Sequence, residues 1–82
     1  MYELIFTDFA NKQFSKLDHQ LKRRMYAVLE RSRIRPEAHF QRLVGRPLYK
    51  LRVGDYRLIA DIDKGELIIL IVRLGHRSNV YD

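Results

Sequence analysis

The chain has 82 residues, which is enough for one modest core and too few for a second lobe, so we predict a single domain spanning residues 1–82. It contains no cysteine, which excludes disulfide stapling and cysteine-based zinc sites. A net charge of +6 and a pI of about 10.0 favour a polyanionic partner such as a nucleic acid.

The positive charge is concentrated in the middle of the chain. Between Gln20 and Arg57 there are eleven Lys and Arg against three Asp and Glu, a balance of +8, while the remaining residues sum to −2. A clustered positive field attracts polyanions and speeds their encounter. A basic surface without a dedicated partner is the alternative that charge alone leaves open.

No stretch of the sequence predicts a membrane segment or an export signal. Residues 1–7 lack a basic region followed by a long apolar run, so we expect no signal peptide. The longest apolar run, residues 67–72, is far shorter than the roughly 20 residues that a membrane-spanning helix needs. Together with the absence of cysteine, these features favour a cytoplasmic protein with no membrane partner.

The first part of the chain predicts a strand followed by two helices. Residues 2–6 form the strand, and Thr7 or Asp8 can cap the next helix, because either side chain accepts bonds from free backbone N–H groups. Asp18 offers a second cap. The apolar stripes have helical spacing and comprise Ala10, Phe14, Leu17 and Leu21, then Leu21, Met25, Val28 and Leu29. We expect an antiparallel helical hairpin that ends before Pro36, since the residue preceding a proline is pushed out of the α region.

After Pro36 the pattern changes to that of a sheet. Residues 36–46 form a connector, with Phe40 and Leu43 as its anchors to the core. Strands are predicted at residues 47–53, 56–62 and 67–74, separated by turns at residues 54–55 and 63–65. We expect Gly65 to take a positive φ and Gly75 to break the last strand. The predicted fold is α+β: an N-terminal strand, the helical hairpin, then a three-strand antiparallel meander, with the helices packed on one sheet face.

Strand alternation sorts the side chains of the meander into two faces. The core-facing set comprises Tyr49, Leu51, Val53, Tyr56, Leu58, Ala60 and Ile62. Lys50, Arg52 and Arg57 are then left on the opposite face, with only Asp61 to offset them. Like charges placed close together destabilise a fold, so this cluster indicates a missing anion such as phosphate. An ordinary solvated sheet face is the alternative interpretation.

Other kinds of site find little support. His19, His39 and His76 show no metal-ligand spacing, so we predict no metal site. There is no phosphate-binding Gly-rich loop, no Ser/His/Asp arrangement and no obvious carboxylate pair, and we expect no cofactor. Tyr81 could be a core aromatic, a stacking platform for a base or a proton donor, and its position alone does not decide.

Three stretches taken together resemble the RelE/ParE toxin superfamily. They read LYKLR from Leu48, DYRLI from Asp55 and VRLGHR from Val72, and the last is followed by Val80 and Tyr81. The opening strand and the helical hairpin also fit, so the resemblance covers nearly the whole chain. RelE-type toxins are described as metal-independent endoribonucleases that cut mRNA in the ribosomal A site and are held inactive by an antitoxin. The resemblance therefore implies an mRNA interferase with mRNA, the ribosome and a RelB-like antitoxin as partners.

The resemblance also implies a set of catalytic residues. Lys50 and Arg52 match the paired basic positions of the family's first meander strand, and Arg57 matches the arginine that follows the tyrosine of the second. Arg77 matches the arginine just past the glycine, and Tyr81 matches the C-terminal tyrosine. His76 matches a histidine found in sister branches of the family. Arg52 stands where the archetype has lysine. Because arginine keeps its proton, a base role falls to Lys50, His76 or Tyr81. The sequence ends one residue after Tyr81, so we expect the C-terminal helix of some members to be absent.

The implied chemistry suits these residue types. RNA can be cut by its own 2′-OH attacking the adjacent phosphate, if the site aligns that oxygen, neutralises charge on the phosphoryl oxygens and moves protons. Arg57 and Arg77 suit the phosphate, because guanidinium can bind it through two bonds. Tyr81 or His76 could stack on a base or protonate the leaving 5′-oxygen.

Three other functions stay open. A ParE-like toxin that inhibits DNA gyrase shares the fold, although the basic residues together with Tyr81 favour the nuclease. A non-catalytic nucleic-acid-binding module would show salt-dependent affinity and produce no new RNA ends. A degenerate, inactive toxin is the third.

Overall fold

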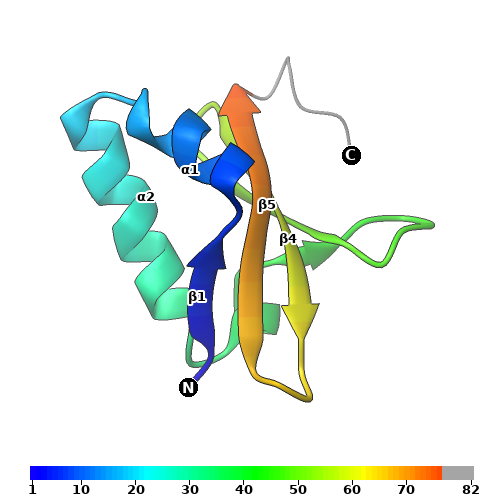
Figure 1. Ribbon diagram of the computed structural model, residues 1–82. Helices are drawn as coiled ribbons and strands as arrows, with labels where there is room; N and C mark the ends of the chain where they lie inside the picture. The colour runs from blue at the N-terminus through cyan, green and yellow to red at the C-terminus, as the bar shows by residue number, and fades with distance from the viewer. Residues whose placement is uncertain (77–82) are drawn as a thin grey trace.

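The computed structural model describes residues 1–76. Two helices cover one face of a five-stranded mixed sheet (Figure 1). The strands are β1 (Glu3–Phe6), β2 (Gln41–Arg42), β3 (Tyr49–Val53), β4 (Tyr56–Asp63) and β5 (Ile68–His76); the helices are α1 (Asp8–Ser15), α2 (His19–Ser32) and the short 3-10 helix η1 (Pro36–Ala38). The predicted α+β class and the order of strand, helices and meander are confirmed. Within residues 1–76, no helix combines the length and the apolar character needed to cross a membrane.

The strand order in the sheet is β1-β5-β4-β3-β2. β1 runs parallel to β5, and the other neighbouring strands are antiparallel. β5 therefore has a strand on each side, and most of its residues are buried or half-buried. β2 lies inside the segment predicted as a connector. The sequence does not indicate this strand, because two residues are too few to show alternation.

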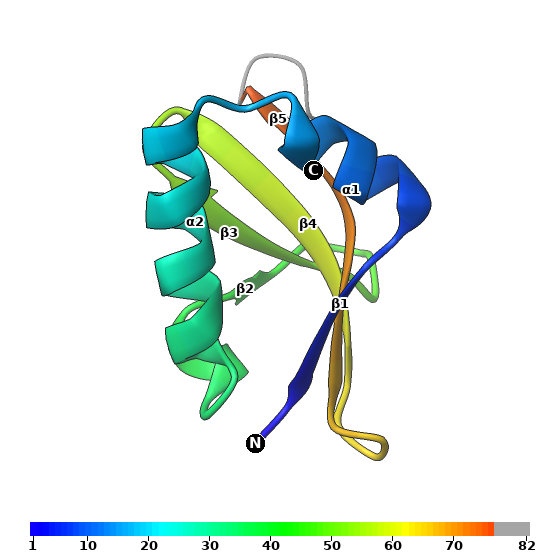
Figure 2. The ribbon, with the colours of Figure 1, turned by 60° about the vertical axis from the view of Figure 1, so that its left-hand side comes forward.

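Both long helices begin at the predicted caps. Thr7 Oγ1 accepts a hydrogen bond from the N–H of Ala10 at 3.1 Å, and Asp18 Oδ1 accepts one from the N–H of Leu21 at 2.9 Å. The chain turns back between α1 and α2, as Figure 2 shows. Leu17, predicted in the first apolar stripe, lies in this connection and still packs against the core.

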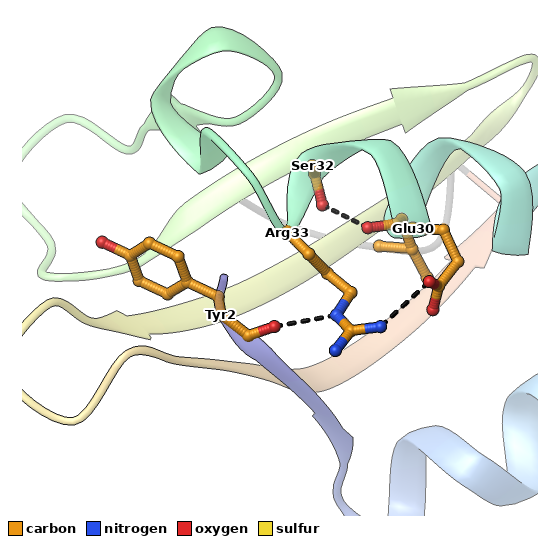
Figure 3. Close-up of polar contacts among 5 residues, drawn as sticks. Tyr2, Glu30, Ser32 and Arg33 are labelled. Carbon is orange, nitrogen blue, oxygen red and sulfur yellow. Dashed lines mark hydrogen bonds and ion pairs between the residues drawn. The ribbon is translucent and has the colours of Figure 1, made fainter.

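Arg33 ties the end of α2 to the N-terminal strand (Figure 3). Its Nε donates to the backbone oxygen of Tyr2 at 2.8 Å, and the N–H of Tyr2 donates back to the oxygen of Arg33 at 2.8 Å. Its Nη1 pairs with Glu30 at 3.0 Å. Ser32 is buried beside it and donates to the oxygen of Leu29 at 2.6 Å. Arg33, one of the basic residues between Gln20 and Arg57, therefore stabilises the fold.

The main core lies between the helices and the sheet. Its buried members are Ala10, Met25, Leu29, Phe40, Leu51, Val53, Leu58, Ala60, Ile69, Ile71 and Leu74. A second, smaller cluster lies on the other sheet face, where Ile59 is buried against Leu43 and Leu48. The predicted anchors Phe40 and Leu43 are thus both buried, but in different clusters.

Two predictions about glycine are wrong. Gly65 does not take a positive φ; the residue in the β4–β5 turn that does is Leu67, at 57°. Asp63 Oδ1 accepts hydrogen bonds from the N–H groups of Gly65 and Glu66, both at 3.0 Å. The left-handed conformation is then adopted by Leu67, the residue before β5.

Gly75 does not break the last strand either. It is in register with Arg57, and β5 continues to His76. A residue without a side chain therefore lies opposite a bulky arginine, and glycine inside a strand is typical of such crowded positions.

The β3–β4 turn depends on Gly54. Gly54 has a φ of 60°, as expected for the first residue of a two-residue hairpin turn, and a Cβ added there would lie 3.3 Å from Nη1 of Arg24. We expect Gly54→Ala to lower the free energy of unfolding by about 1–2 kcal/mol, because left-handed backbone is costly for a residue with a Cβ. Urea denaturation measures this. Gly65→Ala is the matched control, since Gly65 lacks a positive φ; equal losses in both variants would contradict the explanation.

Candidate nucleic-acid interface

The face of the sheet away from the helices carries the predicted cation cluster. Leu51 and Val53 pack into the main core, so Lys50 and Arg52 point to the opposite side of β3. Arg57 of β4 is directly opposite Arg52 in the strand register. Like charges at such cross-strand positions repel each other.

These three cations line one hollow with a volume of about 330 Å³. His39, Gln41 and Leu51 complete its lining. Arg57 is half-buried, with its Nε shielded from solvent, whereas Arg52 is exposed. Asp61, predicted to share this face, does not line the hollow. The volume lies at the lower end of the roughly 300–1,000 Å³ typical of ligand sites.

Two residues of the hollow are missing from the predicted site. Phe40 is buried in the main core, whereas its neighbours His39 and Gln41 line the hollow on the open face. Gln41 is in register with Lys50. The sequence pattern that could have indicated these two residues is an aromatic residue between two polar ones. Three residues are too few to predict a strand.

A β-bulge in β5 decides which of its side chains reach this face. Ile59 is in register with Arg73 and Ala60 with Ile71, so Val72 is an extra residue without a counterpart in β4. Beyond Val72 the two faces of β5 are exchanged relative to strict alternation. Arg73 consequently shares the open face with Ile59, in the same row across the sheet.

The N-cap of α1 and a residue of its last turn bond to backbone groups around the bulge. The hydroxyl of Thr7 donates to the oxygen of Val72 at 2.8 Å, and Gln13 Oε1 accepts from the N–H of Leu74 at 2.8 Å. Leu74 then joins the main core. The bulge is thus stabilised by side chains from a distant part of the sequence.

The structure does not bring His76 together with the cation cluster. His76 is in register with Tyr56, and their rings meet edge to face with centroids 5.7 Å apart. Tyr56 packs against the main core, so His76 lies on the opposite sheet face from Arg57. Arg77 and Tyr81 lie outside the described residues.

The fold and this face define a small α+β protein with a cation-lined hollow on its open sheet face. Residues 4–81 match the family described as the ParE toxin of type II toxin-antitoxin system, parDE. The chain belongs to this toxin family, which confirms the predicted membership of the RelE/ParE superfamily. No curated protein matches the sequence significantly.

Chains from solved structures of RelE-RelB toxin-antitoxin complexes share the fold. A chain of the intact E. coli RelBE toxin-antitoxin complex is 25% identical, with a TM-score of 0.82 over 93% of this chain and 96% of that one. A chain of the RelBE2 complex from Mycobacterium tuberculosis is 28% identical, with a TM-score of 0.73 over 93% and 98%. A chain of the archaeal RelE-RelB complex from Pyrococcus horikoshii OT3 is 24% identical, with a TM-score of 0.81 over 96% and 98%. By structure, the protein is a toxin of the RelBE type.

Proposed function

We propose that this toxin is an mRNA interferase, a metal-independent endoribonuclease that cuts mRNA at the ribosomal A site by attack of the 2′-OH on the adjacent phosphate. The observation that carries this proposal is the hollow shared by Lys50, Arg52 and Arg57. A phosphodiester bound there would offset the repulsion between the two arginines, which are directly opposite in the sheet. The phosphate of RNA is the simplest anion that meets this requirement.

Each cation suits a task in phosphoryl transfer, which depends on alignment and on stabilising charge at the phosphoryl oxygens. Arg57 is half-buried within a paired strand, and its guanidinium can donate two parallel bonds to one phosphate. Lys50 supplies a compact point charge, and the exposed Arg52 can contact the RNA backbone. Arg77, Tyr81 and His76 stay predictions from the resemblance.

We also propose that a RelB-like antitoxin binds the toxin. The two long helices share a shallow hollow of about 430 Å³, lined by Phe14, His19, Lys22, Arg23, Tyr26 and Ala27. Tyr26 is exposed, as is Phe9 on α1. Apolar surface with a positively charged rim suits a flexible, acidic, amphipathic chain that folds on binding. A short acidic protein encoded beside this one would support the pairing.

Two assays on one preparation test the catalytic function. The purified protein is incubated with mRNA-programmed ribosomes in the presence of a chelator, and new RNA ends are mapped by primer extension; DNA supercoiling by gyrase is measured in parallel. We expect new mRNA ends and no inhibition of supercoiling. Gyrase inhibition without cleavage would identify the ParE-like function instead. Salt-dependent RNA binding with neither activity would identify a non-catalytic binding module.

A further inference from the structure

We propose that His39 is the general base that removes the proton from the attacking 2′-oxygen. This inference rests on the proposed RNA cleavage and names the group that performs one of its steps. His39 is half-buried and lines the same hollow as Lys50, Arg52 and Arg57. It would therefore be near the ribose next to a phosphate held by these cations.

The backbone around His39 is held on both sides. The N–H groups of His39 and Phe40 both donate to the oxygen of Pro36, at 3.0 and 2.8 Å, and Pro36 itself is buried. Phe40 is only 4% exposed in the main core, and Gln41 pairs with Lys50 across β2 and β3. Because the position is anchored by packing and by strand pairing, the imidazole is kept at the hollow.

The residue types in the hollow leave imidazole as the proton acceptor. The guanidinium groups of Arg52 and Arg57 do not lose their protons, and the amide of Gln41 does not titrate. Among the remaining side-chain types, imidazole alone is neutral in substantial amounts near neutral pH without help from its surroundings. The ammonium group of Lys50 is then retained for the phosphate. His76 lies on the opposite sheet face, beside Tyr56.

The proposed step balances without a metal or a further reactant. An imidazole nitrogen of His39 takes the 2′-hydroxyl proton as the bond between O2′ and phosphorus forms. The bond between phosphorus and O5′ breaks, and the leaving 5′-oxygen takes a proton from water. The products are a 2′,3′-cyclic phosphate end and a 5′-hydroxyl end, and the imidazolium returns its proton to water.

His39→Gln is expected to lower kcat for mRNA cleavage by about 10²–10⁴-fold, the usual contribution of a general base. KM and the thermal unfolding midpoint should change little, because glutamine keeps a polar side chain of similar size in the hollow. Glu37→Gln is the control, since Glu37 is exposed on η1, two residues before His39, and lies outside this hollow. It should cleave as the unaltered protein does. A raised KM or a lowered unfolding midpoint with unchanged kcat in His39→Gln would overturn the assignment.

A modified substrate separates a base from an acid. When sulfur replaces the bridging 5′-oxygen at the cleavage site, the leaving thiolate needs no proton, so the loss of an acid is repaired and the loss of a base is not. We expect His39→Gln to stay slow on this substrate; recovery to the rate of the unaltered protein would overturn the proposal. Full activity of His39→Gln on mRNA would overturn it and leave the proposed nuclease standing. No cleavage by the unaltered protein would overturn both.

Discussion

Replacing Arg57 by alanine is expected to lower mRNA cleavage by about 10²–10³-fold, the range seen when a group that stabilises transition-state charge is removed. Arg57 is the half-buried member of the cation cluster, and its strand pairs with β3 on one side and β5 on the other. Its guanidinium can therefore meet the phosphoryl oxygens with little loss of side-chain freedom. Single-turnover cleavage on programmed ribosomes measures the effect.

Two further variants show whether position or charge is responsible. Arg57→Lys keeps the charge but loses paired donation, so its cleavage rate should fall between those of the unaltered protein and Arg57→Ala. Arg31→Ala removes the same group from the exposed part of α2, outside the hollow, and should leave cleavage unchanged. Equal losses in Arg57→Ala and Arg31→Ala would indicate a general effect of net charge and would contradict the site.

Leu29→Ala is expected to lower the free energy of unfolding by about 2–5 kcal/mol, because it removes a buried side chain and leaves a cavity. Leu29 is 0% exposed and joins α2 to the sheet in the main core. Domains are stable by only about 5–15 kcal/mol in total, so this one change removes a large part of the stability. Urea denaturation with a fluorescence or circular dichroism readout measures it.

Leu67→Ala is the matched control for Leu29→Ala. Leu67 lies in the β4–β5 turn and is 45% exposed, so the same truncation should change the free energy of unfolding by no more than about 0.5 kcal/mol. If the two variants lost equal stability, burial in the main core would not be the cause. The pair also provides a reference for the cleavage assays, since Leu29→Ala lowers activity only through the folded fraction.

The cation cluster could be predicted from the sequence because it depends on local geometry. Side chains alternate along any strand, and the apolar residues of β3 and β4 identify the core face, which leaves Lys50, Arg52 and Arg57 on the other. The helix starts could be predicted for the same reason, since Thr7 and Asp18 each bond to a backbone N–H three residues ahead. The face of each strand and the start of each helix are decided within a few residues.

The contribution of the segment before β3 could not be predicted. His39 and Gln41 reach the hollow because Phe40 is buried on the opposite side and because β2 pairs with β3. A strand of two residues has no periodicity, and its pairing partner is set by the packing of the whole connection, including Leu43 against Ile59. Alternation within the meander therefore cannot predict that His39 and Gln41 line the hollow.

The sequence by itself determined the α+β class, the helix caps and the open basic face of β3 and β4, because each follows from short-range periodicity or capping. Only the tertiary structure decided the faces of β5. The bulge at Val72 turns Arg73 toward the open face and His76 away from it. That bulge is held by Thr7 and Gln13, which are 65 and 61 residues away from their hydrogen-bond partners. A contact over such a separation leaves no periodic signal in the strand, so the division of β5 between core and open face depends on how α1 packs.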